Sequence, residues 1–271
     1  MNNKSFYLHI GLPRTGTTFL QNSIFNNIND INFILKPDLI DLKSKIKSNQ
    51  VNLISDEGLL GNVWGDNRFI SIEKLYKNYP DAKIIIGFRK HHKWVQSMYS
   101  LYLKRGGSLK VDKFLDLDFN NGILNKKQLD FSDLLKEIKN KFKYKPFVYF
   151  LEEIESKDNK LINDLSNYLG VDIDNEKFDY KVKNKGLNSI QKELCRKINS
   201  FFISNFNKNG YIKLSIANKF NLYPIKISSL FYNNYSTKIS NRDKNFYDKI
   251  KKIYKNDWDI LLSESKLIRS N

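Results

Sequence analysis

Short apolar runs alternate with stretches of helical spacing over the first two thirds of the chain. The runs are β-branched or aromatic and predict strands at Phe6–Ile10, Val51–Ser55, Lys83–Phe88 and Pro146–Phe150. The stretches between them predict helices at Thr17–Asn27, Leu39–Lys47, His91–Arg105, Phe131–Phe142 and Asn159–Leu169. This alternation predicts an α/β fold of the P-loop type, a three-layer α/β/α arrangement with a mostly parallel central sheet.

The strand signal fades after about residue 181. Helical spacing returns at Asn188–Phe206 and at Asp243–Leu262, and the Asn- and Tyr-rich stretch between them reads as loops. No repeat and no low-complexity linker interrupts the chain. We therefore expect a single domain over 1–271, with an α/β core at 1–180 and a helical, basic C-terminal subregion at 181–271.

Composition narrows the class of protein. With 271 residues, 41% of them hydrophobic and 14% aromatic, the chain can bury a sizeable core, which excludes wholesale disorder. A single cysteine, Cys195, excludes a disulfide scaffold and a cysteine-based zinc cluster. No stretch approaches the roughly 18–20 apolar residues of a membrane span, and the first residues lack the pattern of a secretory signal. We expect a soluble protein of the cytoplasm.

Positive charge is concentrated in the last third. The chain carries 46 Lys and Arg against 29 Asp and Glu, a net charge of +17. Residues 1–180 contribute +4 of this excess and residues 181–271 contribute +13. The last third is where an anionic partner would bind. Alternatively, the excess reflects an AT-rich genome, since Lys, Asn and Ile make up 103 of the residues.

The most informative segment is a loop between the first strand and the first helix. It reads Gly-Leu-Pro-Arg-Thr-Gly-Thr-Thr over residues 11–18. A strand, a glycine-containing loop with hydroxyl residues and then a helix is the arrangement that directs backbone amides at a phosphate. The alternative is an ordinary strand–helix turn that happens to contain glycines.

This loop departs from that of nucleoside triphosphatases. Gly11 and Gly16 have the spacing of that motif, but Thr17 stands where its lysine would be, and the cation is Arg14 inside the loop. The strand that ends at Phe88 is followed by Arg89 rather than by a metal-binding aspartate. These features favour an anion that is bound by protein cations, with no metal required.

Arg89 opens a second candidate cluster. Ser97 follows it eight residues later, in the second turn of the predicted helix at His91–Arg105. A guanidinium at the carboxyl end of a strand and a hydroxyl on the next helix can both reach one phosphate in the crevice where open α/β sheets bind ligands. Taken alone, the pair could equally form surface contacts.

Together, the two clusters resemble the sulfotransferase family. The loop resembles the family's 5′-phosphosulfate loop, P-K-[ST]-G-T-T, and Arg89 with Ser97 matches its 3′-phosphate signature, R-x7-S. Weaker similarity to bacterial carbohydrate-type sulfotransferases lies in residues 55–57, 102–107 and 150–153. The specific resemblance covers roughly residues 5–105, and only the general layout is similar beyond residue 181.

The resemblance implies an enzyme that transfers a sulfuryl group from 3′-phosphoadenosine-5′-phosphosulfate (PAPS), leaving 3′-phosphoadenosine-5′-phosphate (PAP). Arg14 takes the place of the family's loop lysine, beside the sulfate and the leaving oxygen, while Arg89, Ser97 and Lys185 would hold the 3′-phosphate. The donor's 5′ end would be held by the loop residues Pro13, Arg14, Thr15, Gly16, Thr17 and Thr18. At Lys185 the family's R-K-G loop begins here with asparagine, which weakens that assignment.

The acceptor proton needs a base, which is Glu in some family members and His in others. Glu57 is the first candidate, because it follows the strand Val51–Ser55 at the edge of the sheet where the donor would lie; the alternative is a solvated or helix-capping acid. His9 is expected to be structural, and His91 and His92 to be exposed or near the 3′-phosphate. No metal ligand set is evident. Glu152 and Glu153 could orient the acceptor or the loop, or form surface charge.

No motif in the sequence identifies the acceptor. A basic last third and abundant aromatic side chains suit a saccharide or glycolipid, so we expect a bacterial cell-envelope or capsular saccharide, with at most peripheral membrane contact. Two other functions stay open: a P-loop phosphotransferase that uses Mg-ATP, and a non-enzymatic polyanion-binding module. No motif for reading nucleic acid is present.

Overall fold

The computed structural model describes residues 5–37, 42–65, 67–157, 159–173, 186–213 and 241–269. The chain divides into two compact units. The first comprises Met1–Lys90, Lys127–Lys181 and Lys255–Asn271, and the second comprises His91–Lys126 and Val182–Tyr254. Among the described helices, none has the length and apolar character needed to cross a lipid bilayer.

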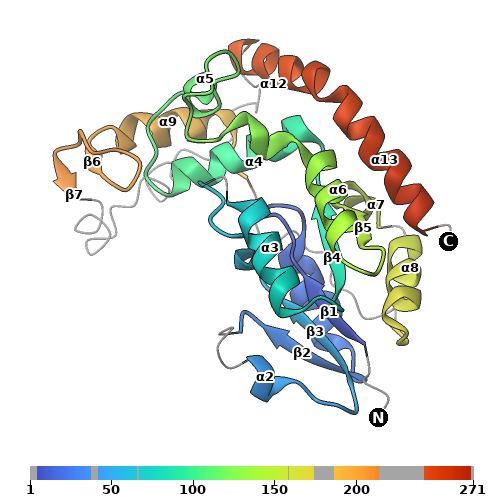
Figure 1. Cartoon of the computed structure of the whole chain (residues 1–271). Helices are drawn as coiled ribbons and strands as arrows, with labels where there is room; N and C mark the ends of the chain where they lie inside the picture. Colours follow the sequence, from blue (N-terminus) through green and yellow to red (C-terminus); the bar gives the residue numbers. More distant parts are fainter. Residues whose placement is uncertain are drawn as a thin grey trace. The chain divides into compact units, whose positions relative to one another are not determined.

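A parallel sheet forms the centre of the first unit (Figure 1). Its strands are β1 (Phe6–His9), β2 (Ile31–Leu35), β3 (Val51–Ser55), β4 (Lys83–Phe88) and β5 (Phe147–Phe150). They lie side by side in the order β2-β3-β1-β4-β5, and every neighbouring pair is parallel. The predicted α/β fold with a parallel central sheet is confirmed.

The strand order fixes where a ligand can bind. After β1 the chain builds β2 and β3 on one side of it, and then β4 and β5 on the other side. Because the chain moves outward from β1 in opposite directions, a crevice opens next to β1, beyond the carboxyl ends of the strands. The loop after β1 therefore lies at the expected ligand site of this sheet.

Helices cover both faces of the sheet. The first unit contains α1 (Thr17–Phe19), η1 (Leu20–Ile24), η2 (Phe25–Asn27), α2 (Leu42–Lys45), η3 (Glu57–Leu60), α3 (Arg68–Asn78), α6 (Phe131–Lys141), α7 (Leu151–Ser156), α8 (Asn159–Leu169) and α13 (Lys255–Arg269). One face of the sheet shares a core with η1, η2 and α8. On the other face, Phe88 packs against Phe131 of α6 and Phe150 against Trp258 of α13, with ring centroids 5.5 and 4.9 Å apart.

The first unit departs from the sequence-based expectation at β2 and α3, neither of which was predicted. β2 is an edge strand in which only Ile31 and Ile34 are buried, so its five residues carry a weak apolar signal. Its Asn32 amide donates to Asn52 Oδ1 of β3 at 2.8 Å, a contact between distant positions. The predicted helix at Leu39–Lys47 is limited to α2 within the described residues.

The second unit is mainly helical. It contains α4 (His91–Lys104), α5 (Val111–Phe114), α9 (Ser189–Asn199) and α12 (Asn241–Ile253), together with two short parallel strands, β6 (Phe202–Ile203) and β7 (Ile212–Lys213). A further turn, η4 (Lys126–Leu129), lies where the chain passes from this unit back to the first. α4 packs against both α9 and α12.

Two predicted helices of the last third are wrong in extent. The helix predicted at Asn188–Phe206 ends at Asn199, because the Asn207 amide donates to the carbonyls of Asn199 and Phe202 at 3.0 and 2.8 Å and turns the chain toward β6. The helix predicted at Asp243–Leu262 is interrupted at Tyr254, where α12 ends before α13 begins. The expected single domain with a boundary near residue 181 stays a prediction.

Candidate active site

Polar residues follow four neighbouring strands at the carboxyl edge of the sheet. Across the sheet, the order is Glu57 after β3, the loop 11–18 after β1, Arg89 after β4 and Glu152 after β5. Adjacent strands lie about 4.8 Å apart, so one extended anionic ligand can span several of these positions. All of them belong to the first unit.

The loop after β1 is tightly turned. Arg14 and Gly16 have left-handed backbone angles, with φ of 69° and 96°. A Cβ at Gly16 would lie 2.6 Å from Ile154 Cδ1, and one at Gly11 would lie 2.7 Å from Thr17 Oγ1. Both glycines are therefore required for this course of the chain. The helical segment 17–27 starts directly after the loop, and the N–H groups of Phe19 and Leu20 donate to the Gly16 carbonyl oxygen at 2.9 and 3.2 Å. The N–H groups of Thr17 and Thr18 precede these bonds at the start of the segment, a position that suits an anion.

Hydroxyl groups of the loop stabilise the loop itself. Thr15 is fully buried and its Oγ1 donates to the Leu12 carbonyl oxygen at 2.6 Å. Thr17 is also buried and hydrogen-bonds the Glu57 carboxylate. Pro13 and Thr18 are half-buried. Contact between these residues and a sulfate donor stays a prediction, and the buried hydroxyls of Thr15 and Thr17 favour backbone N–H groups as the contacting atoms.

Arg14 and Glu57 interact across the loop. Burial lowers the pKa of the Arg14 guanidinium, while the negative charge of Glu57 opposes that shift. Burial raises the pKa of the Glu57 carboxyl above its ordinary value, and the Thr17 hydrogen bond with the charges of Lys36 and Arg14 limits the rise. A partly desolvated carboxylate beside a cation has the character of a general base.

Glu57 owes its position to the end of β3. Asp56 follows this strand, and its carboxylate accepts a hydrogen bond from the Gly58 N–H at 2.8 Å. This cap starts η3 at Glu57, so the capping acid is Asp56 rather than Glu57. The alternative in which Glu57 serves as a helix cap is wrong.

Arg89 lies at the end of β4 in an incompletely satisfied environment. Its Nη2 is 3.9 Å from Glu155 Oε1, and its buried Nε has no hydrogen-bond partner among the described residues. Burial lowers the pKa of the guanidinium, the charges of Glu155 and Glu152 oppose the shift, and the charge of Arg14 adds to it. Two arginines close enough to repel each other, one with an unsatisfied buried donor, indicate an anion site.

Of the two other residues predicted to hold the 3′-phosphate, one belongs to the second unit and the other lies outside the described residues. Ser97 is buried on α4, in the second unit. Lys185 lies outside the described residues. Their contact with a 3′-phosphate stays a prediction.

The histidines have structural surroundings. His9 is fully buried, with Nδ1 2.7 Å from Ser55 Oγ and Nε2 3.0 Å from Tyr149 Oη, and burial lowers its pKa to about 3. The expectation that His9 is structural agrees with these contacts. His91 is buried and its ring stacks on Tyr254 at 5.1 Å, so the exposed alternative is wrong for His91, whereas its place near the 3′-phosphate stays a prediction. The described residues include no cluster of three or more His, Cys, Asp or Glu that could hold a metal ion.

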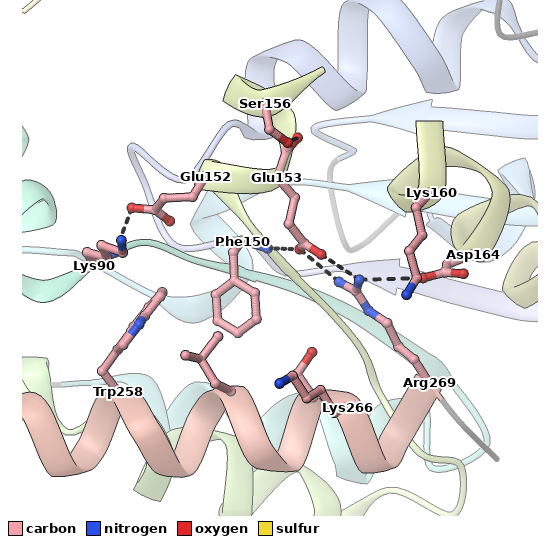
Figure 2. A pocket seen from close by; sticks show the side chains of 12 residues that line it. Lys90, Phe150, Glu152, Glu153, Ser156, Lys160, Asp164, Trp258, Lys266 and Arg269 are labelled. Carbon is pink, nitrogen blue, oxygen red and sulfur yellow. Dashed lines mark hydrogen bonds and ion pairs between the residues drawn. The ribbon is translucent and has the colours of Figure 1, made fainter. Parts of the chain in front are cut away.

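A pocket of about 670 Å³ opens beside β5 (Figure 2). In the sheet, β1 and β4 separate β5 from β3, the strand that precedes Glu57. Phe150 and Trp258 line the pocket, with Lys90 and Glu152 at one end and Arg269 at the other. Glu152 Oε1 accepts from the Lys90 N–H at 3.2 Å, and Glu152 Oε2 is buried with no hydrogen-bond partner among the described residues. Sequence reasoning missed this pocket, because α13 follows β5 by about a hundred residues.

Glu153 has a structural role that the sequence left open. Its Oε2 accepts from the Phe150 N–H at 2.8 Å, which caps α7. The same carboxylate pairs with Arg269 of α13, whose Nη1 lies 2.6 Å from Glu153 Oε1 and 3.5 Å from Asp164 Oδ2. These contacts tie α13 to α7 and α8, so Glu153 is fully engaged by the protein.

Comparisons with known sequences and structures give evidence about this chain that does not depend on the geometry of the site. The sequence model of the sulfotransferase domain family matches residues 66–153, a segment that contains β4, Arg89 and β5. A solved structure of a sulfotransferase from Alicyclobacillus acidocaldarius shares the fold, with a TM-score of 0.51 and 15% sequence identity over 68% of this chain and 87% of that chain. No curated protein sequence matches this chain. The chain is thus similar to the sulfotransferase domain family over residues 66–153, and it shares its fold with a solved bacterial sulfotransferase.

Proposed function

We propose that this protein transfers a sulfuryl group from PAPS to a hydroxyl, or an amine, of a saccharide. The observation that carries the proposal is the pair of arginines at the ends of β1 and β4. Arg14 and Arg89 lie close enough for the charge of Arg14 to lower the pKa of Arg89, and the Arg89 Nε lacks a partner among the described residues. A donor with phosphate groups at both ends of its ribose offers an anion to each arginine.

The reaction requires two things of the protein: stabilisation of the charge on the leaving oxygen and a base for the acceptor's proton. Sulfuryl transfer is an in-line displacement in which negative charge develops on the oxygen that links sulfate to phosphate. Arg14 and the N–H groups at the start of the helical segment 17–27 stabilise that charge. Glu57 accepts the proton of the attacking hydroxyl, and its raised pKa brings it closer to the range in which a carboxylate is an effective base.

The acceptor class rests on weaker support. The last third of the chain carries a net charge of +13, which suits an anionic or lipid-linked saccharide of the cell envelope or capsule. Phe150 and Trp258 also contribute aromatic side chains to the lining of the pocket beside β5. We propose a cytoplasmic reaction, because the single cysteine, Cys195, is a free thiol, as in proteins of reducing compartments.

Two other functions are separable by experiment. A phosphotransferase that uses Mg-ATP has to function with Thr17 where the motif has lysine and with Arg89 where a metal-binding aspartate is usual. A polyanion-binding module would show steep salt dependence and would not depend on Arg14 or Arg89.

The test is calorimetric binding of PAP in the presence of EDTA, beside ATP with Mg²⁺. Metal-independent binding of PAP at micromolar or lower concentration supports the proposal and is followed by an acceptor screen with PAPS. Preference for ATP with Mg²⁺ would replace it with a phosphotransferase. Binding of neither nucleotide would move attention to the basic last third.

A further inference from the structure

Polar side chains from three strands meet beneath the loop 11–18. His9 of β1, Ser55 of β3 and Tyr149 of β5 point to the same face of the sheet, as the strand register requires. All three are fully buried. The face is otherwise apolar, so these groups must satisfy one another.

Gly87 of β4 allows Tyr149 to reach His9. The two strands that carry these residues are separated by β4, and Gly87 is the β4 residue paired with Tyr149. A Cβ at Gly87 would lie 2.2 Å from Tyr149 Cζ and 2.4 Å from its Oη. The tyrosine ring therefore crosses β4 through the space that a side chain would fill.

The contacts form a continuous chain from the first helical segment to the loop. The Gln21 amide donates to Ser55 Oγ at 2.9 Å, and Ser55 Oγ lies 2.7 Å from His9 Nδ1. His9 Nε2 lies 3.0 Å from Tyr149 Oη, which hydrogen-bonds the side chains of Thr15 and Thr17. Thr17 in turn bonds Glu57.

The groups at the two ends of this row of hydrogen bonds determine which atom donates and which accepts in each bond. Thr15 donates its one hydroxyl proton to the Leu12 carbonyl oxygen, so its oxygen accepts from Tyr149. Tyr149 then accepts from His9 Nε2–H, and His9 Nδ1 accepts from the Ser55 hydroxyl, which accepts from Gln21. With His9 neutral and its proton on Nε2, every bond has a donor when the single Tyr149 proton is shared between Thr15 and Thr17, because Thr17 donates its own proton to Glu57. Since burial lowers the pKa of His9 to about 3, it is neutral at ordinary pH.

We propose that His9 and Tyr149 are positioning residues of the donor site, which hold Thr15 and Thr17 in place and, through Thr17, orient Glu57. This inference rests on the proposed function. Neither side chain touches the substrate; each acts on the loop and on the base through hydrogen bonds. It predicts that removing one buried hydroxyl, the Tyr149 Oη, alters donor binding and turnover although the loop sequence is unchanged.

The test compares Tyr149→Phe with a matched control, Tyr7→Phe. Tyr7 is equally buried on the same face, and its hydroxyl donates to the Tyr168 carbonyl oxygen at 2.8 Å, away from the loop. Both variants lose a tyrosine hydroxyl, and Tyr149→Phe should lose more thermal stability, because its hydroxyl contacts His9, Thr15 and Thr17. Only Tyr149→Phe should weaken PAP binding and raise the donor KM, each by about 3–10-fold, the equivalent of one hydrogen bond, and lower kcat as well.

A second variant and a spectroscopic signature make the test specific. Ser55→Ala removes the donor to His9 Nδ1 and should reproduce part of the Tyr149→Phe effect, with the ratio of PAP to 5′-AMP affinity unchanged because Arg89 is untouched. The ¹⁵N spectrum of His9 in the wild-type protein should show the Nε2–H neutral tautomer from pH 6 to 8. An imidazolium or the Nδ1–H tautomer would overturn the assignment.

The outcomes separate the two proposals. If wild-type protein binds PAP and Tyr149→Phe behaves like Tyr7→Phe in donor KM and kcat, the positioning role is wrong and the proposed function stands. If wild-type protein binds no PAP, the proposed function fails and the positioning role falls with it. A selective effect of Tyr149→Phe supports both.

Discussion

The two ends of the candidate donor site are built differently. Beneath the loop after β1, the buried side chains of Ser55, His9, Tyr149 and Thr15 are joined by hydrogen bonds to one another and to the backbone. At the end of β4, the buried Nε of Arg89 has no hydrogen-bond partner among the described residues, and its Nη2 lies 3.9 Å from Glu155 Oε1. The polar side chains beneath the loop are hydrogen-bonded within the protein, whereas the guanidinium of Arg89 has a donor that a ligand can still satisfy.

The difference matters because the two kinds of site respond differently to a ligand. A fully bonded loop holds its backbone N–H groups in place before the ligand arrives, and little reorganisation opposes the reaction. An unsatisfied buried donor has already lost its water, so a ligand that satisfies it gains affinity. We therefore expect the loop to govern turnover and Arg89 to govern the choice of nucleotide.

The largest effect should come from Glu57→Gln. Gln keeps the size of the side chain and can still accept from Thr17, but it does not accept the acceptor's proton. We expect kcat to fall by about 10²–10⁴-fold, the usual contribution of a general base. PAP binding, measured by calorimetry, should change by less than about 2-fold, since Glu57 follows β3 rather than the strands that carry the two arginines.

Glu57→Gln should also leave stability intact. Burial raises the pKa of Glu57, so ionising it costs the folded state free energy at neutral pH. A neutral glutamine removes that cost, and thermal unfolding at pH 7 should occur at the same or a higher temperature. Turnover that survives within a few-fold would show that another group is the base.

Arg14→Gln should have the next largest effect. Loss of the loop cation removes charge stabilisation at the leaving oxygen, and we expect kcat to fall by about 10²–10³-fold. Arg14→Lys restores the charge at the same left-handed backbone position and should recover most of the activity. Single-turnover measurements with PAPS provide the rates. Equal losses in the two variants would mean that the fork geometry, rather than the charge, is needed.

The sequence predicted those parts of this site that are local along the chain. The loop 11–18 and Arg89 each follow a strand directly, so strand order and motif spacing were enough to place them at one edge of the sheet. The hydrogen-bond chain was not predictable in this way, since His9 meets Ser55 and Tyr149 across 46 and 140 positions. Gly87 gave no signal either, because its importance depends on the ring that crosses it.

The same limit applies at the edges of the fold. β2 is a half-buried edge strand whose pairing with β3 stabilises it more than its own pattern does. The end of α9 depends on the side chain of Asn207, eight residues beyond Asn199. Glu153 could not be distinguished from surface charge until Arg269 was found beside it. Local patterns indicate element type, whereas boundaries and roles depend on distant partners.

Arg89→Gln should change selectivity rather than turnover. PAP has a 3′-phosphate and 5′-AMP does not, so only PAP should lose affinity, by about 10–100-fold for a charge-assisted contact. Calorimetry with the two nucleotides measures the ratio. Glu155→Gln is the matched control: it removes the carboxylate 3.9 Å from Arg89 and should leave PAP binding unchanged or slightly tighter. An equal loss of affinity for both nucleotides in Arg89→Gln would contradict the division of roles.

The smallest effect should come from Lys36→Gln. The charge of Lys36 lowers the pKa of Glu57, against the larger effect of burial. If Glu57 is the base, activity increases as pH rises through its pKa. Removing Lys36 raises that pKa, so the acid limb of the pH profile of kcat should move to higher pH, by less than about 0.5 unit for an exposed cation that salt screens.

The direction of this shift distinguishes the electrostatic effect of the Lys36 charge on Glu57 from structural damage to the loop. Lys74→Gln, a change at an exposed position on α3, is the matched control and should leave the profile in place. Raising the salt concentration should move the wild-type limb the same way as Lys36→Gln, and should move the variant less, because the charge to be screened is gone. A shift to lower pH in Lys36→Gln would mean that the ionising group is not a carboxylate influenced by Lys36, and the assignment of Glu57 as the base would fail on its sign alone.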